Sequence, residues 1–383
     1  VYFILWSITQ IFLITFRAKK EIAKAQLPMF FETLGRVVAT IFVVFGGYGA
    51  IALAWTYVIG EIFVLFTTLI MFRGYHFKFQ KPTKEFLKLY LSFAIPMAIV
   101  VASTKIMTNI DKVLIQLFWD AAEGGNYFAI YRLSKFFDMA TKAIGMLLFP
   151  TISALYVKKN MNQIKELAYK SERYLSMFIF PVVFFMIFMA EPVIHIMLSN
   201  KFYPAIPILQ ILPLFALLDA LERPYQMKLL GMNLPHFTRN RVLLMVAVNV
   251  ILNIILIPKD IQSIGITLFG LGAVGAAIAT VSAYFIGLIY TRIIVWKISQ
   301  ITINPRILLH LFAASLMGLL LTLVNEYVYK VNRWYELALF GILGLGFYLF
   351  ILYLLGEFNQ EDFDLFMDTL NLKKMFIYIK GEL

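Results

Sequence analysis

The sequence predicts an all-α fold, a polytopic membrane helix bundle with about 11 transmembrane helices. Its 383 residues are 61% hydrophobic and only 15% charged, whereas soluble chains are about half apolar and a quarter charged. Apolar runs of about 20 residues, enough to cross a hydrocarbon core of about 30 Å, recur from end to end. Backbone groups in lipid must form their hydrogen bonds within the segment, so each run is expected to be a helix. A very large soluble core is the weaker alternative.

The predicted spans follow one another with short connections. Their ends are uncertain by a few residues, and in order they are 1–16, 27–46, 48–72, 89–118, 126–150, 174–198, 204–221, 235–257, 270–296, 307–324 and 334–356. Prolines within or beside the spans are expected to curve or kink the helices, because neighbouring helices re-satisfy the freed carbonyls. These prolines are Pro96, Pro181, Pro192, Pro207 and Pro213.

Basic residues between the spans fall almost entirely on one side of the predicted membrane. The opposite side has only Lys201, Lys259, Lys330 and Arg333. The positive-inside rule makes the richer side cytoplasmic, which places the C-terminus in the cytoplasm. We therefore expect a multi-pass protein of the cell (plasma) membrane. This placement accounts for most of the net charge of +12 without a nucleic-acid partner.

Three local features complete the predicted topology. The chain starts at Val1, and its first span lacks the order of a signal peptide, so we expect an N-terminally truncated sequence that begins inside a helix. Segments 152–171 and 359–380 look amphipathic and are expected along the cytoplasmic interface; a partly disordered end is the alternative for the second. The stretches 46–50 and 272–276 share G-x-x-G-A, each at a predicted tight external hairpin, which suggests parallel duplication.

Charged residues also occur inside the spans, where a central Lys or Arg costs about 2.5–3.5 kcal/mol and normally faces the bundle interior or a wet cavity. The basic ones are Arg36, Lys105, Lys112, Arg132, Lys135 and Lys142. All except Arg36 lie on two consecutive helices. Lys105 and Lys112 project within about 20° of each other. On the next helix Arg132, Lys135, Asp138 and Lys142 share an arc of about 120°.

The charged stripes predict an aqueous, cationic cavity that accepts an anionic group such as phosphate. Asp138 is expected to pair with Lys135 or Lys142 at helical spacing, and Asp111 to pair loosely with a neighbouring lysine, which leaves a surplus of cations. The alternative is a set of structural ion pairs with some lysines extended to the headgroups. For the cluster as a whole we favour the cavity. The predicted substrate-binding residues are Arg36, Lys105, Asp111, Lys112, Arg132, Lys135, Asp138 and Lys142.

Other chemistry has little support in the sequence. The chain has no Cys, so it has no thiol nucleophile, disulfide or thiolate metal site, and its four histidines show no ligand spacing. The G-x-G-x-x-G match at 270–275 lacks the strand and βαβ unit of a dinucleotide site. Asn249 and Asn253 are expected to form hydrogen bonds between helices. We predict no catalytic residue, no metal and no cofactor.

Several stretches, in their order along the chain, resemble the Wzx-like polysaccharide-biosynthesis flippases, the polysaccharide transporters of the multidrug/oligosaccharidyl-lipid/polysaccharide exporter superfamily. The stretches are 92–115, 124–155, 181–212 and 229–258. The resemblance implies a parent of about 14 helices, in two pseudo-symmetric six-helix lobes with two additional helices, of which the first span here matches the fourth. It also implies that Arg132 and Lys135, on the eighth family helix, line a central cavity.

The domain boundaries follow from the spans and this resemblance. They are 1–72 for the remainder of the N-terminal lobe, 73–91 for a cytoplasmic linker, 92–296 for the C-terminal six-helix lobe, 297–356 for two additional transmembrane helices and 357–383 for a cytoplasmic tail.

The function implied by the resemblance is flipping of a lipid-linked oligosaccharide on an isoprenoid phosphate or pyrophosphate carrier, by alternating access between the lobes. The expected partners are that substrate, membrane lipids and the glycan polymerase or glycosyltransferase machinery. A related multidrug or cation antiporter is one alternative, but it would call for an acidic cavity. A membrane glycosyltransferase or ligase is another, but such enzymes usually need sizeable external loops with catalytic acids. We therefore expect a transporter and not an enzyme.

Overall fold

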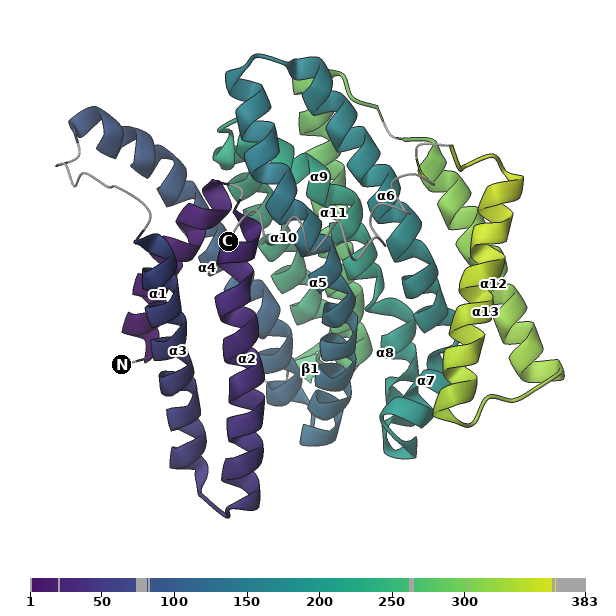
Figure 1. The fold of residues 1–383 in the computed structure, drawn as a ribbon. Coiled ribbons are helices and arrows are strands. Elements are labelled where there is room, and N and C mark those ends of the chain that lie inside the picture. Colours follow the sequence, from purple (N-terminus) through teal and green to yellow (C-terminus); the bar gives the residue numbers. More distant parts are fainter. Residues whose placement is uncertain are drawn as a thin grey trace. The chain divides into compact units, whose positions relative to one another are not determined.

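The computed structural model describes residues 2–19, 21–73, 81, 83–261, 265–302, 304–359 and 362, and at 50, 137–144, 146, 261 and 266 it describes the backbone only. These residues form two compact units. The first holds α1 (Tyr2–Ala18), α2 (Ile22–Phe45) and α3 (Ala50–Phe72). In it α2 and α3 make a tight hairpin, and α1 packs along α3 (Figure 1).

The second unit extends over Lys84–Phe358. Its elements are α4 (Lys84–Phe118), α5 (Ala121–Val157), α6 (Met161–Phe188), α7 (Ala190–Met197), the 3₁₀ helix η1 (Asn200–Ala205), α8 (Ile206–Ile211), α9 (Leu214–Gly231), α10 (Pro235–Leu256), the strands β1 (Asp260–Ile261) and β2 (Ile266–Thr267), α11 (Gly272–Ser299), α12 (Arg306–Tyr327) and α13 (Trp334–Leu354). Within it α10 packs between α4 and α11, α5 lies along α9, and α6 contacts both α9 and α12 (Figure 1). The additional helices α12 and α13 therefore belong to the same compact unit as α4–α11.

The predicted fold class is confirmed. Nine helices in the described part of the chain are long and apolar enough to cross a membrane. The two strands form a minimal antiparallel pair, in which Asp260 faces Thr267 and Ile261 faces Ile266. Large apolar side chains remain exposed along most helices, for example Phe42 and Leu343, as expected where the surroundings are lipid.

Several predicted boundaries are wrong, because helices continue beyond the apolar runs. Residues 84–91, expected in a linker, form the first turns of α4. Segment 152–171, expected along the cytoplasmic interface, forms the end of α5, a short turn and the start of α6; its place at the interface stays a prediction. The span predicted at 204–221 is shifted, with η1 and α8 preceding a helix that continues to Gly231. The tail at 359–380, expected along the cytoplasmic interface, lies outside the described residues, apart from 359 and 362.

The repeated G-x-x-G-A stretches differ in structure. The first is a tight hairpin, in which Gly47 adopts a positive φ of 68°. The second follows a connection that contains β1 and β2, so its predicted tight hairpin is wrong. Its glycines serve close packing, since a Cβ on Gly275 would lie 2.7 Å from the Leu256 carbonyl oxygen of α10. This geometry fits helix packing and not nucleotide binding.

Two prolines in the α6–α7 region are compensated by α13 and α12. Pro181 has no N–H for the carbonyl of Met177, one turn earlier, and the Tyr348 hydroxyl of α13 donates to that carbonyl at 3.1 Å. Pro192 likewise frees the carbonyl of Phe188, where α6 ends and α7 begins.

The hydroxyl of Thr322 on α12 lies 3.3 Å from the freed carbonyl of Phe188. The same hydroxyl lies 3.1 Å from the carbonyl of Gly318 on its own helix. The expectation that neighbouring helices would re-satisfy proline-freed carbonyls is confirmed at Pro181, where α13 supplies the donor. At Pro192 the one proton of the Thr322 hydroxyl is shared with the carbonyl of Gly318.

Candidate functional site

Asp111 of α4 lies inside unit 2, where four helices meet, and the residue is only 2% exposed. It accepts hydrogen bonds from the hydroxyl of Tyr127 on α5 at 2.6 Å, the amide of Asn253 on α10 at 2.5 Å and the hydroxyl of Thr280 on α11 at 2.7 Å. The expected loose pairing of Asp111 with Lys112 or Lys105 is therefore wrong. Neutral donors satisfy this carboxylate, as a buried charge requires.

The two asparagines of α10 take part in the same network. Asn253 also donates to Asn249 at 3.1 Å, and Asn249 donates to Thr280 at 3.3 Å. The predicted hydrogen bonds between helices are confirmed. Asp111 thus fixes α4 against α5, α10 and α11.

The next residue, Lys112, lies about 100° further round α4 and also faces α5. Its ammonium lies 5.2 Å from the centroid of Tyr131 and also 5.2 Å from that of Phe128, both on α5. The ammonium of Lys135 lies 5.5 Å from the same Tyr131 ring. Cations from two helices therefore gather at one aromatic side chain. Such contacts stabilise an ammonium by about 0.5–1 kcal/mol at exposed positions.

Lys105 and Arg132 are exposed on the same two helices, one on α4 and the other on α5. Helical periodicity puts Lys105 on the face of Lys112, two turns earlier. Among the residues that the structure describes, Lys105, Lys112 and Arg132 have no acidic ion-pair partner. We call Lys105, Lys112, Arg132 and Lys135 the cationic face of unit 2.

Of the remaining predicted site residues, Arg36 lies in unit 1, and Asp138 and Lys142 have side chains that the structure does not describe. Arg36, in unit 1, has its own counter-ion: it forms an ion pair with Glu32 at 3.1 Å and lies 4.7 Å from the ring centroid of Tyr57. It lines a hollow of about 290 Å³ between α2 and α3, with Thr56 and Gly60. The side chains of Asp138 and Lys142 are not among those described, so their predicted pairing stays a prediction.

Sequence reasoning missed a layer of buried ion pairs that joins α6, α9, α10 and α11. It contains three carboxylates with arginine partners: Glu172 with Arg292, Glu222 with Arg241, and Asp219 with Arg223. Hydroxyl groups complete it, with Tyr225 donating to Glu172 at 2.5 Å and Thr291 donating to Glu222. The sequence alone places these arginines among the basic residues that mark the cytoplasmic side. They lie within helices, and their acidic partners hold them inside the unit.

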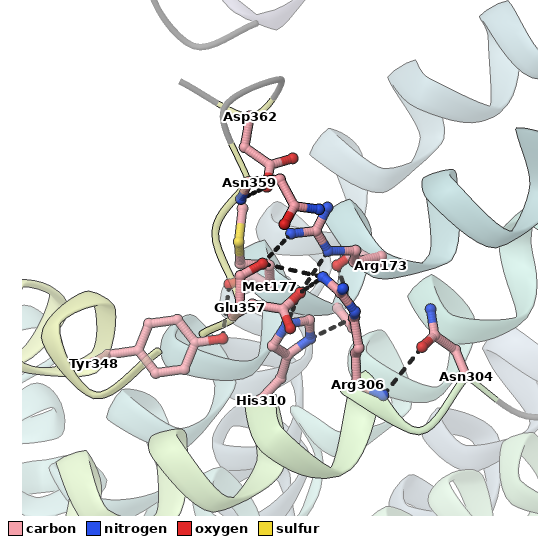
Figure 2. A network of polar contacts seen from close by, with 10 residues as sticks. Arg173, Met177, Asn304, Arg306, His310, Tyr348, Glu357, Asn359 and Asp362 are labelled. Atoms are coloured by element: carbon pink, nitrogen blue, oxygen red, sulfur yellow. Dashed lines mark hydrogen bonds and ion pairs between the residues drawn. The ribbon is translucent and has the colours of Figure 1, made fainter. Parts of the chain in front are cut away.

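A second missed cluster surrounds Glu357, just after α13 (Figure 2). Arg173 of α6 binds its carboxylate at 2.5 Å, and Arg306 of α12 lies 3.4 Å from the same oxygen. Both arginines also donate to the Glu357 backbone carbonyl, at 2.5 Å and 3.0 Å. Burial alone would raise the pKa of the Glu357 carboxyl, but His310 and Arg173 outweigh burial and lower that pKa below its ordinary value. We call Arg173, Arg306, His310 and Glu357 the Glu357 cluster.

A signal for both clusters was present in the sequence. Glu172 directly precedes Arg173, and Glu222 directly precedes Arg223, so each acid stands in an otherwise basic stretch near the end of an apolar run. An acid placed among basic residues near a membrane surface suggests an ion pair. Counting only the basic residues concealed it.

Comparison with known proteins agrees with the architecture. Residues 1–207, more than half of the chain, match the family model described as "Polysaccharide biosynthesis protein". A membrane protein of Methanocaldococcus jannaschii, MJ1068, is 28% identical over 162 residues, which cover 42% of this chain and 29% of that protein. The match thus spans under a third of the archaeal relative.

Solved transporter structures share the fold at low sequence identity. The lipid II flippase MurJ, in its inward closed conformation, superposes with a TM-score of 0.65 and 17% identity over 92% of this chain and 71% of that chain. A MATE structure in the bent conformation gives a TM-score of 0.60 and 16% identity over 73% of this chain and 63% of that chain. With the fold of these transporters and a family model matched over more than half of its length, the chain belongs to the polysaccharide biosynthesis protein family of multi-pass membrane proteins.

Proposed function

We propose that this chain belongs to a flippase that moves a lipid-linked oligosaccharide across the membrane by alternating access, and that the cationic face binds the phosphate of its isoprenoid carrier. The observation that carries the proposal is the gathering of Lys112 and Lys135 at Tyr131. Arg132 directly follows Tyr131 in sequence, on the helix that also contains Lys135. The same proposal places the protein in the cell membrane, with its C-terminus in the cytoplasm and glycan-assembling enzymes as its partners.

The energetic argument concerns the surplus of positive charge. Lys112 and Arg132 have no described acidic partner; Lys112 lies well inside α4, which is long and apolar enough to cross a membrane, and Arg132 lies inside the 37-residue α5. A basic side chain in hydrocarbon costs about 2.5–3.5 kcal/mol unless water or an anion reaches it. A phosphate or diphosphate supplies several acceptor oxygens, and a guanidinium binds two of them in parallel. The cation–π contacts of the lysines are weak enough for such an anion to displace.

Asp111 has a positioning role in this proposal and does not bind substrate directly. Its three hydrogen bonds hold α4 against α5, α10 and α11. Because Lys112 is the next residue, the same bonds set the direction in which its ammonium points. The buried network and the cationic face thus lie next to each other on α4, and both contact α5, through Tyr127 and Tyr131 respectively.

The alternatives have less support from the described residues. A cation antiporter calls for an exposed acid, whereas the carboxylate of Asp111 is enclosed and saturated with donors. A glycosyltransferase calls for available acids in external connections. In the connection between α4 and α5, Asp120 caps the Glu123 amide at 2.8 Å, and Glu123 accepts from the Ala273 amide at 2.9 Å. Both acids therefore have structural partners.

A flipping assay in proteoliposomes tests the proposal, with a lipid-pyrophosphate glycan as substrate and a cationic dye as competitor. Arg132→Ala with Lys135→Ala is expected to abolish flipping while the protein still inserts. The matched control is Lys158→Ala with Lys159→Ala, which removes two exposed charges at the end of the same helix. Wild-type flipping by the first variant would refute the phosphate-binding role. Transport of the dye in preference to the glycan lipid would favour the antiporter.

A further inference from the structure

Unit 1 holds an ion pair of its own at membrane depth. Arg36 lies near the middle of α2, and its guanidinium pairs with the carboxylate of Glu32, one turn earlier, at 3.1 Å. Both α2 and the neighbouring α3 are long and apolar enough to cross a membrane. Charged groups at such positions normally face a wet cavity or another polar group, because hydrocarbon offers them no hydrogen bonds.

The ion pair lines a hollow of about 290 Å³ between α2 and α3, close to the lower end of the range of about 300–1,000 Å³ for small-ligand sites. A Cβ on Gly35 would meet no atom within 4 Å, so this position opens onto free space. A Cβ on Gly60 would lie 2.5 Å from Oε1 of Glu32, so this glycine leaves room for the carboxylate. We call this space the Arg36 hollow; its polar and small lining residues are Glu32, Gly35, Arg36, Ala39, Thr56 and Gly60.

The guanidinium of Arg36 has hydrogen-bonding capacity that the protein does not use. A guanidinium carries five N–H donors, and one carboxylate accepts at most two of them in parallel. Among the residues that the structure describes, Glu32 is the one recorded acceptor for Arg36. The other recorded neighbour is the ring of Tyr57, whose centroid lies 4.7 Å from the guanidinium carbon. Most of the donors therefore remain for a ligand or for water in the hollow.

The charges of the Arg36 hollow favour a neutral ligand. Arg36 and Glu32 cancel, and the carboxyl of Glu61 on α3, 7% exposed and within electrostatic range of both, adds no positive charge. A phosphate would be repelled by Glu32, whereas the cationic face of unit 2 offers it several basic groups. A sugar is uncharged, and each of its hydroxyls both donates and accepts hydrogen bonds. A guanidinium beside a carboxylate supplies the complementary donors and acceptors.

Aromatic rings complete the hollow. Phe31 of α2 and Phe63 of α3 also line it, and they are 53% and 47% exposed. The face of an aromatic ring is partly negative, and the C–H groups on the flat side of a sugar ring are partly positive, so the two pack together. A sugar can therefore place its C–H face on a phenylalanine and its hydroxyls on the ion pair.

We propose that the Arg36 hollow binds a sugar residue, with Arg36 and Glu32 bonding its hydroxyls and Phe31 or Phe63 contacting its C–H face. The inference rests on the proposed function, because it assigns the saccharide part of that substrate to unit 1 and leaves the phosphate to the cationic face. An ion pair that only stabilised α2 would not need the open space at Gly35.

Binding measurements on the full chain in nanodiscs test the site with two probes. The first is the mixture of phosphate-free oligosaccharides that mild acid releases from the lipid-linked glycans of the source cells, detected by saturation-transfer NMR. The second is inorganic pyrophosphate, followed by ³¹P NMR. The native chain is expected to bind both. Absence of saccharide binding to the native chain would overturn the proposal. Absence of pyrophosphate binding alone would refute the role of the cationic face and leave the hollow as the sugar site.

Two variants assign saccharide binding to the hollow. Gly35→Leu fills the space and keeps the ion pair, and Arg36→Met removes the donors. Both should weaken saccharide binding by about tenfold or more, the loss expected for a hydrogen bond to a charged group, and leave pyrophosphate binding unchanged. The matched control is Gly346→Leu on α13, where an added Cβ also meets nothing within 4 Å; it should bind both probes like the native chain.

Undiminished saccharide binding by Gly35→Leu would overturn the proposal. Loss of pyrophosphate binding in Arg36→Met would also overturn it, because Arg36 would then hold an anion and not a sugar. If Arg36→Met does not fold, Gly35→Leu decides, since that variant retains both charges.

Discussion

Tyr348→Phe is the most direct test of how the additional helices contribute to this fold. The change removes one hydroxyl from a fully buried ring and leaves its packing intact. That hydroxyl donates to the Met177 carbonyl at 3.1 Å, and Pro181 prevents this carbonyl from bonding within α6. The substitution therefore leaves a buried acceptor without a donor.

The expected loss in the free energy of unfolding is about 1 kcal/mol. Leaving a buried acceptor unsatisfied costs about 1–3 kcal/mol. Hydrogen bonds between helices in membranes average only about 0.6 kcal/mol, because the unfolded chain in lipid also finds partners. The bond length of 3.1 Å, at the long end of the hydroxyl range, favours the lower part of this interval.

A double-mutant cycle isolates the bond. Pro181→Ala restores an N–H that reaches the Met177 carbonyl within α6, so Tyr348→Phe should cost little in that background. Reversible unfolding in mixed micelles, followed by circular dichroism, gives the four free energies. The control is Tyr353→Phe, which changes an exposed tyrosine of the same helix and should have almost no effect.

The coupling between the two substitutions decides the outcome. Equal costs of Tyr348→Phe in the native and Pro181→Ala backgrounds would show that the hydroxyl does not compensate for the proline. The reasoning would also fail if Tyr348→Phe and Tyr353→Phe had the same effect on stability.

Two further predictions concern the packing of unit 2. Glu222→Gln is expected to destabilise by about 3 kcal/mol, because it leaves the buried guanidinium of Arg241 with only the carboxylate of Asp219, 4.0 Å away, as a charged partner. Glu222→Leu with Arg241→Met should cost less; unfolding midpoints compare them, and a larger loss in the double variant would contradict the ion-pair interpretation. Gly275→Ala is expected to cost about 1–3 kcal/mol, since its Cβ would lie 2.7 Å from a backbone oxygen of α10. Gly346→Ala, which meets nothing within 4 Å, should be neutral or stabilising in the same assay, and equal effects would refute the close-contact argument.

Sequence reasoning located the helices because hydrocarbon permits few alternatives for an apolar run. It placed their ends poorly. The apolar run ends where the lipid ends, but helix hydrogen bonds continue as long as a neighbouring helix covers them, as in α5, which reaches Val157. The start of α4 at Lys84 shows the same effect.

Sequence reasoning also identified the charged helices α4 and α5, but not the partners of each charge. Asp111 and Lys112 are adjacent in sequence, but neutral donors enclose Asp111 while Lys112 lies over aromatic rings of α5, so adjacency predicted a pair that does not form. The partners of Asp111 lie 16, 142 and 169 residues away in the chain. No local pattern contains that information.

Composition and hydrophobic run length alone determined that this protein is a helical membrane bundle, and the unusual cations of α4 and α5 already stood out in the sequence. Only the tertiary structure decided which charges are enclosed and paired, such as Glu222 with Arg241, and which remain exposed, such as Arg132. The physical reason is that insertion into lipid depends on each segment by itself, whereas the partner of a buried charge or a proline-freed carbonyl is supplied by another helix.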